Sequence, residues 1–410
     1  MDDRSTIDAF LRKRRDQQAA FLAELVRRPS DNPPGDCAGH GEMAAGLLEG
    51  LGLEVERHPV PGDLVRENGM VSATNLVVRH RFGEGGPVIA LNAHGDVVPP
   101  GEGWTKDPYG AAVEEGWMYG RGVAVSKSDF ASYAFALLAL REEAAGLAGT
   151  VELHLTYDEE AGGVIGPKWL LDEGITKPDL AIAAGFSYAV VNAHNGCLHL
   201  EVQIDGRSAH AAKPYTGVDA LEIANRALGT LYAHRLDYEK RISAIEGIGA
   251  PQLTVGLIQG GINTNVVPDR ITFRLDRRLT PEEDGESVED ELKQVIGQAV
   301  GDVPGARLTI RRILLAEPLR PMAGSEKLVE AVVSRASDVI GEPVGCQGVP
   351  LYTDARHYAA AGIPTILYGA GPRTIEEANA HRADERLPLD DLHKATLVTA
   401  LALRDLLTAP

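Results

Sequence analysis

The histidine at position 94 stands where a hydrolytic enzyme could hold a metal ion. His94-Gly95-Asp96 directly follows the apolar run VIALNA, which has the length of a buried strand. At the end of such a strand His94 can bind a metal through one ring nitrogen while Asp96 holds the other. A polar loop after a buried strand explains the same residues, so this segment alone leaves both interpretations open.

Two adjacent glutamates, Glu159 and Glu160, follow a second apolar run in the segment YDEEAGG. Neighbouring side chains at a strand end point in opposite directions, so one glutamate can bind a metal while the other faces the substrate as a general base. A solvated acidic turn is the plainer interpretation of this segment by itself. His381, in the polar segment NAHRADER, is a third candidate whose meaning depends on its neighbours in the fold.

These segments follow strands that alternate with helices, and this alternation predicts an α/β sheet with helices on its faces. Active sites of such sheets lie outside the carboxyl ends of the strands, where His94 and both glutamates are expected. The helical patterns cover residues 5–28, 41–49, 129–145 and 389–407, and the strand-length runs cover residues 53–60, 74–81, 86–93, 150–158 and 362–371.

The pattern changes near Gly196, where strands begin to alternate polar and apolar residues as half-exposed strands do. Strands and helices then follow in the order β-α-β-β-α-β. Their expected ranges are 197–206, 219–234, 251–261, 270–278, 281–300 and 307–313. We therefore predict a main domain of residues 1–196 and 315–410, interrupted by an inserted domain of residues 197–314.

The chain of 410 residues carries 59 acidic and 40 basic side chains, for a net charge of −19. Such a surface does not hold nucleic acid or anionic lipid by bulk electrostatics, because both require a basic face. The first residues contain no apolar signal segment, and no apolar run approaches the ~18 residues that a membrane span needs. Three cysteines, far apart in the sequence and odd in number, argue against a disulfide framework or a cysteine-based zinc knot. We expect a cytoplasmic protein with a small-molecule substrate.

Taken in order, these segments and several others resemble the acetylornithine deacetylase, succinyl-diaminopimelate desuccinylase and carboxypeptidase G family of metal-dependent amide hydrolases. The resemblance runs over about residues 20–405. No single motif is specific to that family, whereas the series is. The motifs are HxDVVP from His94, GRG from Gly120 with Lys127, DEExGG from Asp158, GxxxH from Gly206, GGxNTNVVPD from Gly260, DxR from Asp276, TDAR from Thr353 and AHxADE from Ala380.

The resemblance implies a zinc-peptidase-like, three-layer α/β/α catalytic domain that binds divalent metal, zinc or manganese. In that family Glu159 matches the general base, and Asp96 is expected to support catalysis beside His94. His94 matches a ligand of one metal ion, while Glu160 and His381 match ligands of a second ion.

The inserted domain, by the same resemblance, is a ferredoxin-like α+β lid that also forms a homodimer. His210 matches the lid histidine that reaches a neighbouring subunit's site to stabilise the oxyanion. Asn265 and Arg278 match lid positions that bind polar groups and the carboxylate of the substrate. Arg356, in the TDAR motif, is a further substrate-binding candidate.

Two positions depart from the family pattern. Val125 stands where the bridging aspartate is expected after GRG, and Gly185 stands where a terminal acidic ligand is expected. Two dications ~3.5 Å apart repel by about 20 kcal/mol even at an effective dielectric constant of about 20, and carboxylates normally offset this repulsion. We therefore predict one ion, held by His94, Glu160 and His381, a ligand set known for single catalytic zinc ions.

The predicted function is metal-dependent hydrolysis of a C–N bond, amide or amine, in a small carboxylate-bearing substrate that is not a protein. The competing hypothesis is a family member that has lost metal hydrolysis and binds a small molecule or uses metal-free acid/base chemistry. Asp129 is a further candidate carboxylate, although a first-turn acid favoured by the helix dipole explains it equally well. Residues 185–189, GFSYA, nearly match the G-x-S-x-G segment of serine hydrolases but lack the last glycine.

Overall fold

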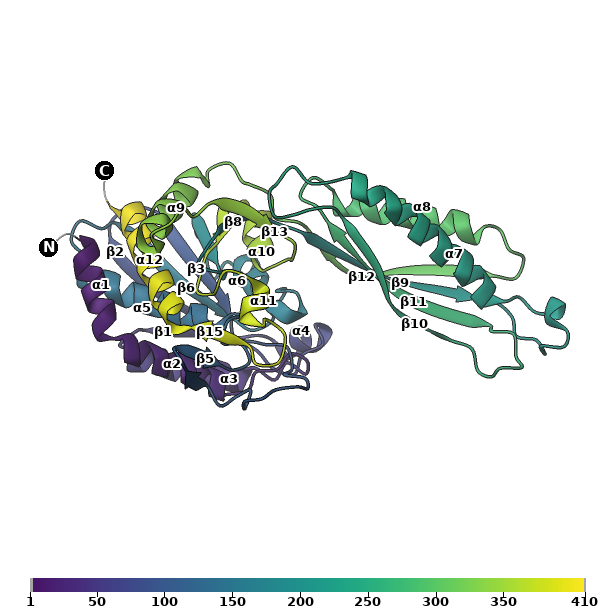
Figure 1. Ribbon diagram of the computed structural model, residues 1–410, viewed down its shortest axis with the longest axis horizontal. Coiled ribbons are helices and arrows are strands. Elements are labelled where there is room, and N and C mark those ends of the chain that lie inside the picture. The colour runs from purple at the N-terminus through teal and green to yellow at the C-terminus, as the bar shows by residue number, and fades with distance from the viewer. Residues whose placement is uncertain (1–2, 409–410) are drawn as a thin grey trace. The chain divides into compact units, whose positions relative to one another are not determined.

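The structure is a computed structural model that describes residues 3–408. Its contacts divide the chain into two compact units, and the first and last helices, purple and yellow in Figure 1, belong to the first. The second unit consists of Ala193–Arg320 and Gly348–Tyr352. It is slightly wider than residues 197–314 at both ends, and it includes a short segment that the sequence pattern assigns to the main domain.

An eight-stranded mixed sheet forms the centre of the first unit, in the order β1-β2-β6-β3-β7-β14-β8-β13. The four central strands β6, β3, β7 and β14 are parallel to one another, whereas β1 and β2 are antiparallel to their neighbours. The strands are β1 (Val55–Pro59), β2 (Thr74–Gly83), β3 (Val88–His94), β6 (Gly149–Thr156), β7 (Leu180–Ala183), β8 (Val190–His194), β13 (Cys346–Val349) and β14 (Thr365–Leu367). A separate small sheet contains β15 (Arg386–Pro388), β5 (Trp117–Tyr119) and β4 (Ala112–Glu114).

Helices cover both faces of the large sheet. Side chains of the central strands alternate between two apolar clusters, and each cluster needs helices to shield it from water. On β3, Ile89 and Leu91 belong to the main core, while Ala90 belongs to a smaller cluster that includes Tyr358. Successive residues of a strand point to opposite faces, so the two clusters lie on opposite sides. Helix α5 contacts β3 and β6, and α10 contacts β7 and β14. The predicted three-layer α/β/α arrangement is confirmed.

The helices of the first unit are α1 (Asp3–Lys13), α2 (Arg15–Arg27), α3 (Ala38–Gly50), α4 (Gly62–Glu67), α5 (Lys127–Glu142), α6 (Pro167–Asp172), α9 (Glu326–Ile340), α10 (Ala355–Ala360), α11 (Ile375–Ala378) and α12 (Leu389–Leu407), with a 3₁₀ turn η1 (Glu159–Ala161). The single helix expected over residues 5–28 is wrong, because the chain breaks at Arg14. Helix α1 packs on α12 and α5, whereas α2 packs on α5 and α3. The two halves of the apolar pattern therefore share α5 and differ in their second partner. In the described residues, every helix is too short or too polar to cross a bilayer.

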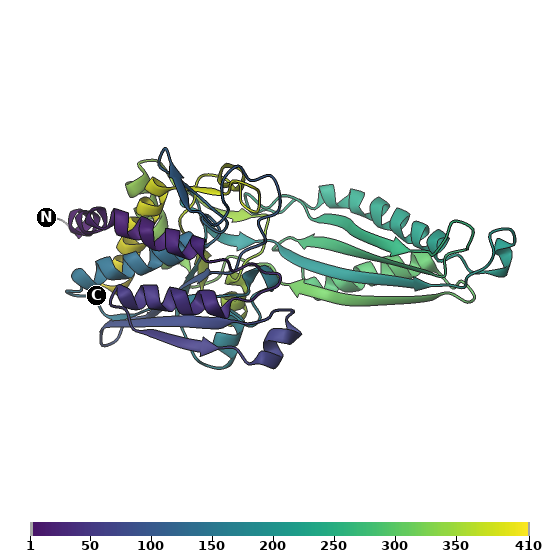
Figure 2. The ribbon, with the colours of Figure 1, turned by 90° about the horizontal axis from the view of Figure 1, so that it is seen from below.

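The second unit has the predicted β-α-β-β-α-β order and a four-stranded antiparallel sheet, β10-β11-β9-β12. Its elements are β9 (Gly196–Asp205), η2 (Pro214–Thr216), α7 (Ala220–His234), η3 (Arg235–Lys240), β10 (Gln252–Gly260), β11 (Arg270–Leu279), α8 (Gly285–Val300) and β12 (Arg307–Ala316). Helices α7 and α8 lie along one face of this sheet (Figures 1 and 2). Leu198, Leu200 and Val202 are buried beneath them, so the intervening polar residues of β9 face the other, open side.

Candidate metal centre and active site

Two parallel strands bring the first two candidate segments together. His94 is the last residue of β3, and the register of β3 with β6 places it opposite Thr156. The turn that carries Glu159 and Glu160 begins directly after β6, so it lies beside His94 at the carboxyl edge of the sheet. Parallel pairing therefore brings together residues that are more than sixty positions apart in the sequence.

Asp96 holds this arrangement in place. Its carboxylate accepts hydrogen bonds from the backbone N–H of Glu159 (3.2 Å) and of Glu160 (3.1 Å), and from the side-chain amide of Asn32 (3.0 Å). The closest partner of His94 Nδ1 is the main-chain oxygen of Asp96 at 2.9 Å, and the Asp96 carboxylate lies 3.4 Å away. A proton on Nδ1 leaves Nε2 of His94 as the basic atom that faces the glutamates.

The donor atoms of a metal centre gather around these glutamates. One donor atom each from His94, Glu159 and Glu160 lies within 4.8 Å of the others. Glu160 Oε1 is 3.3 Å from Nε2 of His381, whose side chain remains 52% exposed. Two ligands of one ion are at most about 4.4 Å apart, because each bond measures about 2.0–2.2 Å. His94, Glu159 and Glu160 lie near that spacing, whereas His381 adjoins the group through Glu160 and is not among its members. Oxygen and imidazole donors suit zinc or manganese.

The electrostatics of the site favour a cation. The pKa of Glu159 is raised to about 8, chiefly by burial; His94 opposes this rise, and the carboxylates of Glu160 and Asp96 contribute to it. Burial alone lowers the pKa of His94, but the carboxylates of Glu159, Asp96 and Glu160 raise it well above its ordinary value. Burial and Glu159 also raise the pKa of Asp354 well above its usual range. Several buried carboxyl groups thus repel one another, and a divalent ion would balance their charge.

A buried ion pair positions the loop that carries His381. Arg121 Nη1 donates to Glu385 Oε2 at 2.6 Å, and both side chains are 1% exposed. Glu385 Oε1 also accepts from the backbone N–H of Ala124 (3.0 Å) and of Val125 (3.2 Å). His381 itself has a φ of +60°, a left-handed conformation that costs energy outside glycine and persists where neighbouring structure enforces it.

Asp354 and Asp158 are buried acids of the site that the sequence interpretation missed. Asp354 belongs to the TDAR segment, from which Arg356 alone was selected. Arg356 Nη2 donates to the main-chain oxygen of Gly162, so this predicted substrate-binding residue also holds the DEExGG turn. Within residues 3–408, Asp354 Oδ2 is buried without a hydrogen-bond partner. The adjacency of Asp354 to Arg356 was the only signal available in the sequence.

Alanine at Gly163 is expected to destabilise the first unit by about 2–5 kcal/mol. Gly163 has a φ of +68°, and a Cβ there would lie 2.1 Å from Asp354 Oδ1 and 2.7 Å from His357 Nε2. Gly174 is a matched control, because its φ is +64° but its nearest new contact is 3.6 Å away. Urea unfolding of both variants separates the cost of the left-handed φ, which Gly163→Ala and Gly174→Ala share, from the cost of the clash, which only Gly163→Ala has. Equal losses in the two variants would contradict the proposed clash.

Stability of the first unit is expected to fall in acid partly through His357, whose Nε2 contacts Gly162 O at 2.9 Å. Burial and the charge of Arg356 lower the pKa of His357 to about 3, whereas the unfolded side chain has its ordinary value of 6.5. The unfolded state therefore binds an extra proton between about pH 6.5 and 3, which removes up to about 1.4 kcal/mol per pH unit. The free energy of unfolding of His357→Gln should show a shallower decline than wild type in this window. Parallel curves would contradict this assignment.

The predicted lid residues all belong to the second unit. His210 is exposed, and its Nδ1 accepts the backbone N–H of Ala212 at 3.0 Å, so a neutral ring carries its proton on Nε2. Ala211 N donates to Asn265 O at 2.9 Å, which places the segments of His210 and Asn265 side by side. Arg278 Nε donates to Asp276 Oδ1 at 3.0 Å.

The near-match to a serine nucleophile segment is structural. Ser187 is fully buried, and its hydroxyl donates to Gly369 O at 3.0 Å and accepts from Gly371 N at 3.2 Å. These contacts fasten the loop after β7 to the loop after β14. The hydroxyl of Ser187 therefore forms structural hydrogen bonds in the core and is not exposed as a nucleophile.

Comparison with known proteins identifies the family. The model of peptidase family M20/M25/M40 matches residues 90–405. The chain belongs to the M20 family. Its motifs and its fold agree with that membership, and the chain is a metallopeptidase-like hydrolase of the amide-cleaving type.

Relatives of this M20 chain extend over almost its whole length. A succinyl-diaminopimelate desuccinylase of Gluconacetobacter diazotrophicus is 27% identical over 401 residues, which cover 94% of this chain and 95% of the relative. An acetylornithine deacetylase of Edwardsiella ictaluri is 30% identical over 365 residues, 88% of each chain. The M20 metallo-carboxypeptidase Sso-CP2 of Sulfolobus solfataricus shares the fold, with a TM-score of 0.76 at 19% identity and coverage of 95% and 98%.

The surroundings of Val125 and Gly185, the two departures from the M20 pattern, are packed with apolar side chains and main chain. Val125 is partly buried against the main core. A Cβ at Gly185 would lie 3.0 Å from the backbone nitrogen of Tyr368, so an acidic side chain there requires that backbone to move. Asp129 is fully buried; its Oδ1 accepts from Ala370 N at 2.8 Å, whereas its Oδ2 is buried without a hydrogen-bond partner within residues 3–408. Asp129 is thus anchored to main chain and lies outside the donor group around Glu159.

Proposed function

We propose that this M20 protein hydrolyses a C–N bond, amide or amine, in a small carboxylate-bearing substrate with one divalent ion, zinc or manganese. The observation that carries the proposal is the convergence of His94, Glu159 and Glu160 donors within 4.8 Å, with His381 3.3 Å from Glu160. Two of the relatives are a desuccinylase and a deacetylase, and this supports an acyl amine as the substrate class.

His94, Glu160 and His381 would hold the ion, and Glu159 would move protons. A bound divalent ion supplies Lewis-acid polarisation of a carbonyl and lowers the pKa of water. Glu159 removes a proton from the attacking water and returns it to the leaving nitrogen. Burial raises the pKa of Glu159, and a dication bound beside it would lower that pKa again toward the ionised form that a general base requires. Asp96 fixes the backbone of both glutamates, so their carboxylates stay aimed at the reacting atoms.

Binding of the substrate is assigned to the lid residues and to Arg356. The Nε2–H of His210 and the side-chain amide of Asn265 would donate to the developing oxyanion, and the guanidinium groups of Arg278 and Arg356 would pair with carboxylate. Family resemblance assigns the histidine to a homodimer in which each lid serves the other subunit. The second unit presents His210 exposed, as such a role requires.

A single ion fits this chain better than two. The residues at the two departures, Val125 and Gly185, supply no carboxylate, and Oδ1 of Asp129 accepts a main-chain N–H. Repulsion between two dications, about 20 kcal/mol at ~3.5 Å, would then have to be offset without the bridging and terminal acids of the family pattern.

Metal analysis tests the number of ions and the ligand set. Glu160→Gln and His381→Ala should each lose about one ion per chain relative to wild type, while Glu173→Gln, a change on an exposed acid, should lose none. Loss of two ions would establish a dinuclear centre. Unchanged metal content in both ligand variants would overturn the proposed site and favour the metal-free or ligand-binding alternative.

Alanine at His210 is expected to lower kcat by about 10²–10³-fold, the usual cost of removing one oxyanion donor. Metal content should not change, because His210 is absent from the donor group. Mixing His210→Ala with the inactive Glu159→Gln chain tests the origin of the histidine. If the lid serves the other subunit, mixed dimers regain activity at one intact site. No recovery from exchanged chains would place His210 in its own subunit's site or outside catalysis.

A further inference from the structure

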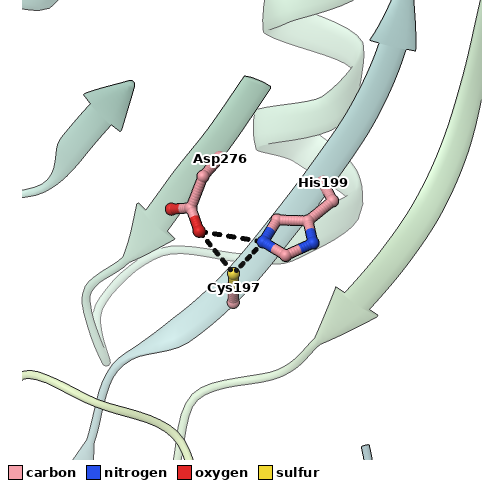
Figure 3. A group of neighbouring side chains, drawn as sticks. All are labelled: Cys197, His199 and Asp276. Carbon is pink, nitrogen blue, oxygen red and sulfur yellow. Dashed lines mark hydrogen bonds and ion pairs between the residues drawn. The ribbon is translucent and has the colours of Figure 1, made fainter. Parts of the chain in front are cut away.

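A thiol, an imidazole and a carboxylate meet in the second unit, on residues that do not belong to the proposed metal centre (Figure 3). Cys197 and His199 are two residues apart on β9 and so point to the same face, and Asp276 is paired with His199 on β11. Cys197 Sγ lies 3.2 Å from His199 Nε2 and 3.5 Å from Asp276 Oδ2, and these last two atoms are 2.8 Å apart. The three atoms form a compact triangle.

We propose that Cys197, His199 and Asp276 form a second divalent-metal site, which binds a zinc-class ion through Sγ, Nε2 and Oδ2. Zinc accepts sulfur, nitrogen and oxygen ligands at about 2.3, 2.0 and 2.0–2.2 Å. Tetrahedral bonds of these lengths place the donor atoms about 3.3–3.6 Å apart, within about 0.5 Å of the observed separations. Three protein ligands leave a fourth position for water or another small ligand.

The direction of the contacts distinguishes a metal site from a cysteine nucleophile. In a nucleophilic triad the thiol and the carboxylate contact opposite nitrogens of the histidine, so that the ring passes a proton from one side to the other. Here both Cys197 and Asp276 contact Nε2 of His199. One nitrogen that points at both partners is the arrangement that a shared ion requires.

The surroundings of the cluster allow an ion to enter and orient its ligands. Cys197 is fully buried, whereas the side chains of His199 and Asp276 are 35% and 30% exposed, so the triangle opens on the side away from α7 and α8. Arg278, the cation that contacts the cluster, donates to Asp276 Oδ1 and leaves Oδ2 available. Such a contact behind a ligand fixes its orientation. A thiolate and a carboxylate together balance the charge of a dication.

The three ligands of this site are distinct from His94, Glu160 and His381, although Asp276 also contacts Arg278, which the proposed function assigns to the substrate carboxylate. Cobalt(II) replaces zinc and gives a near-ultraviolet thiolate-to-cobalt charge-transfer band only where sulfur is bound. Titration of the metal-free full-length protein with cobalt(II) should produce this band in wild type. The band should be lost in Cys197→Ser and strongly weakened in His199→Gln, with about one ion per chain fewer in each.

Two matched controls show which thiol and which metal site give rise to the band. Cys346→Ser removes an exposed thiol outside the cluster, and Glu160→Gln disables the proposed active-site metal; both should keep the band. If Cys197→Ser does not fold, His199→Gln carries the test. No band in wild type at saturating cobalt(II), or a band that survives in Cys197→Ser, would overturn this proposal and leave the proposed function untouched.

Discussion

Replacing Glu159 with glutamine is expected to lower kcat by about 10²–10⁴-fold, the range for removal of a general base. Glutamine keeps the size of the side chain and the backbone N–H that Asp96 accepts at 3.2 Å, but it cannot take a proton from water. The ion should remain bound, because His94, Glu160 and His381 are unchanged. Steady-state kinetics with an N-acyl amino acid and metal analysis of the same preparation measure both outcomes.

The control for this variant is Glu173→Gln, which makes the same chemical change on an exposed residue of the same unit and should leave kcat unaltered. If Glu159→Gln retained wild-type turnover, the base would have to be another group. If it lost both turnover and metal, Glu159 would instead be a ligand, which its place in the donor group also permits. The two readouts together therefore separate a proton-transfer role from a metal-binding role.

Alanine at Glu385 is expected to lower the free energy of unfolding of the first unit by about 3–5 kcal/mol, the usual cost of leaving a buried charge without its partner. The side chains of Arg121 and Glu385 are both 1% exposed, and Nη1 of Arg121 lies 2.6 Å from Oε2 of Glu385. Loss of the carboxylate also removes the acceptor for the backbone N–H groups of Ala124 and Val125. Activity should fall as well, because the same contacts hold the loop of His381.

Tryptophan fluorescence reports this unfolding selectively, because the three tryptophans, Trp104, Trp117 and Trp169, all belong to the first unit. The matched comparison is the double variant Arg121→Met with Glu385→Met, which removes both charges. Since an uncompensated charge is costlier than an apolar pair, the double variant should be more stable than Glu385→Ala. A loss below about 1 kcal/mol in Glu385→Ala, as at an exposed ion pair, would contradict this account.

Strand and motif patterns predicted much of the candidate site. Apolar runs of strand length before His94 and before Glu159 placed both residues at the carboxyl ends of strands, and the register of β3 with β6 agrees. These strand ends are predictable because buried parallel strands are continuous apolar runs followed by polar loops. The partners of these residues were harder to foresee. The contact between His94 and the main-chain oxygen of Asp96 cannot be predicted from a side-chain pattern. Asp354 lies nearly two hundred residues after Glu159 in the sequence.

The sequence by itself determined the two-domain organisation, the M20-like order of motifs and the residue types at each strand end, because these depend on local periodicity and composition. Only the tertiary structure decided which of those residues share a site and how they titrate. Burial raises the pKa of Glu159 to about 8, and strand pairing brings Cys197, His199 and Asp276 together. Both effects depend on distances between atoms that are far apart along the chain, and the folded packing alone sets those distances.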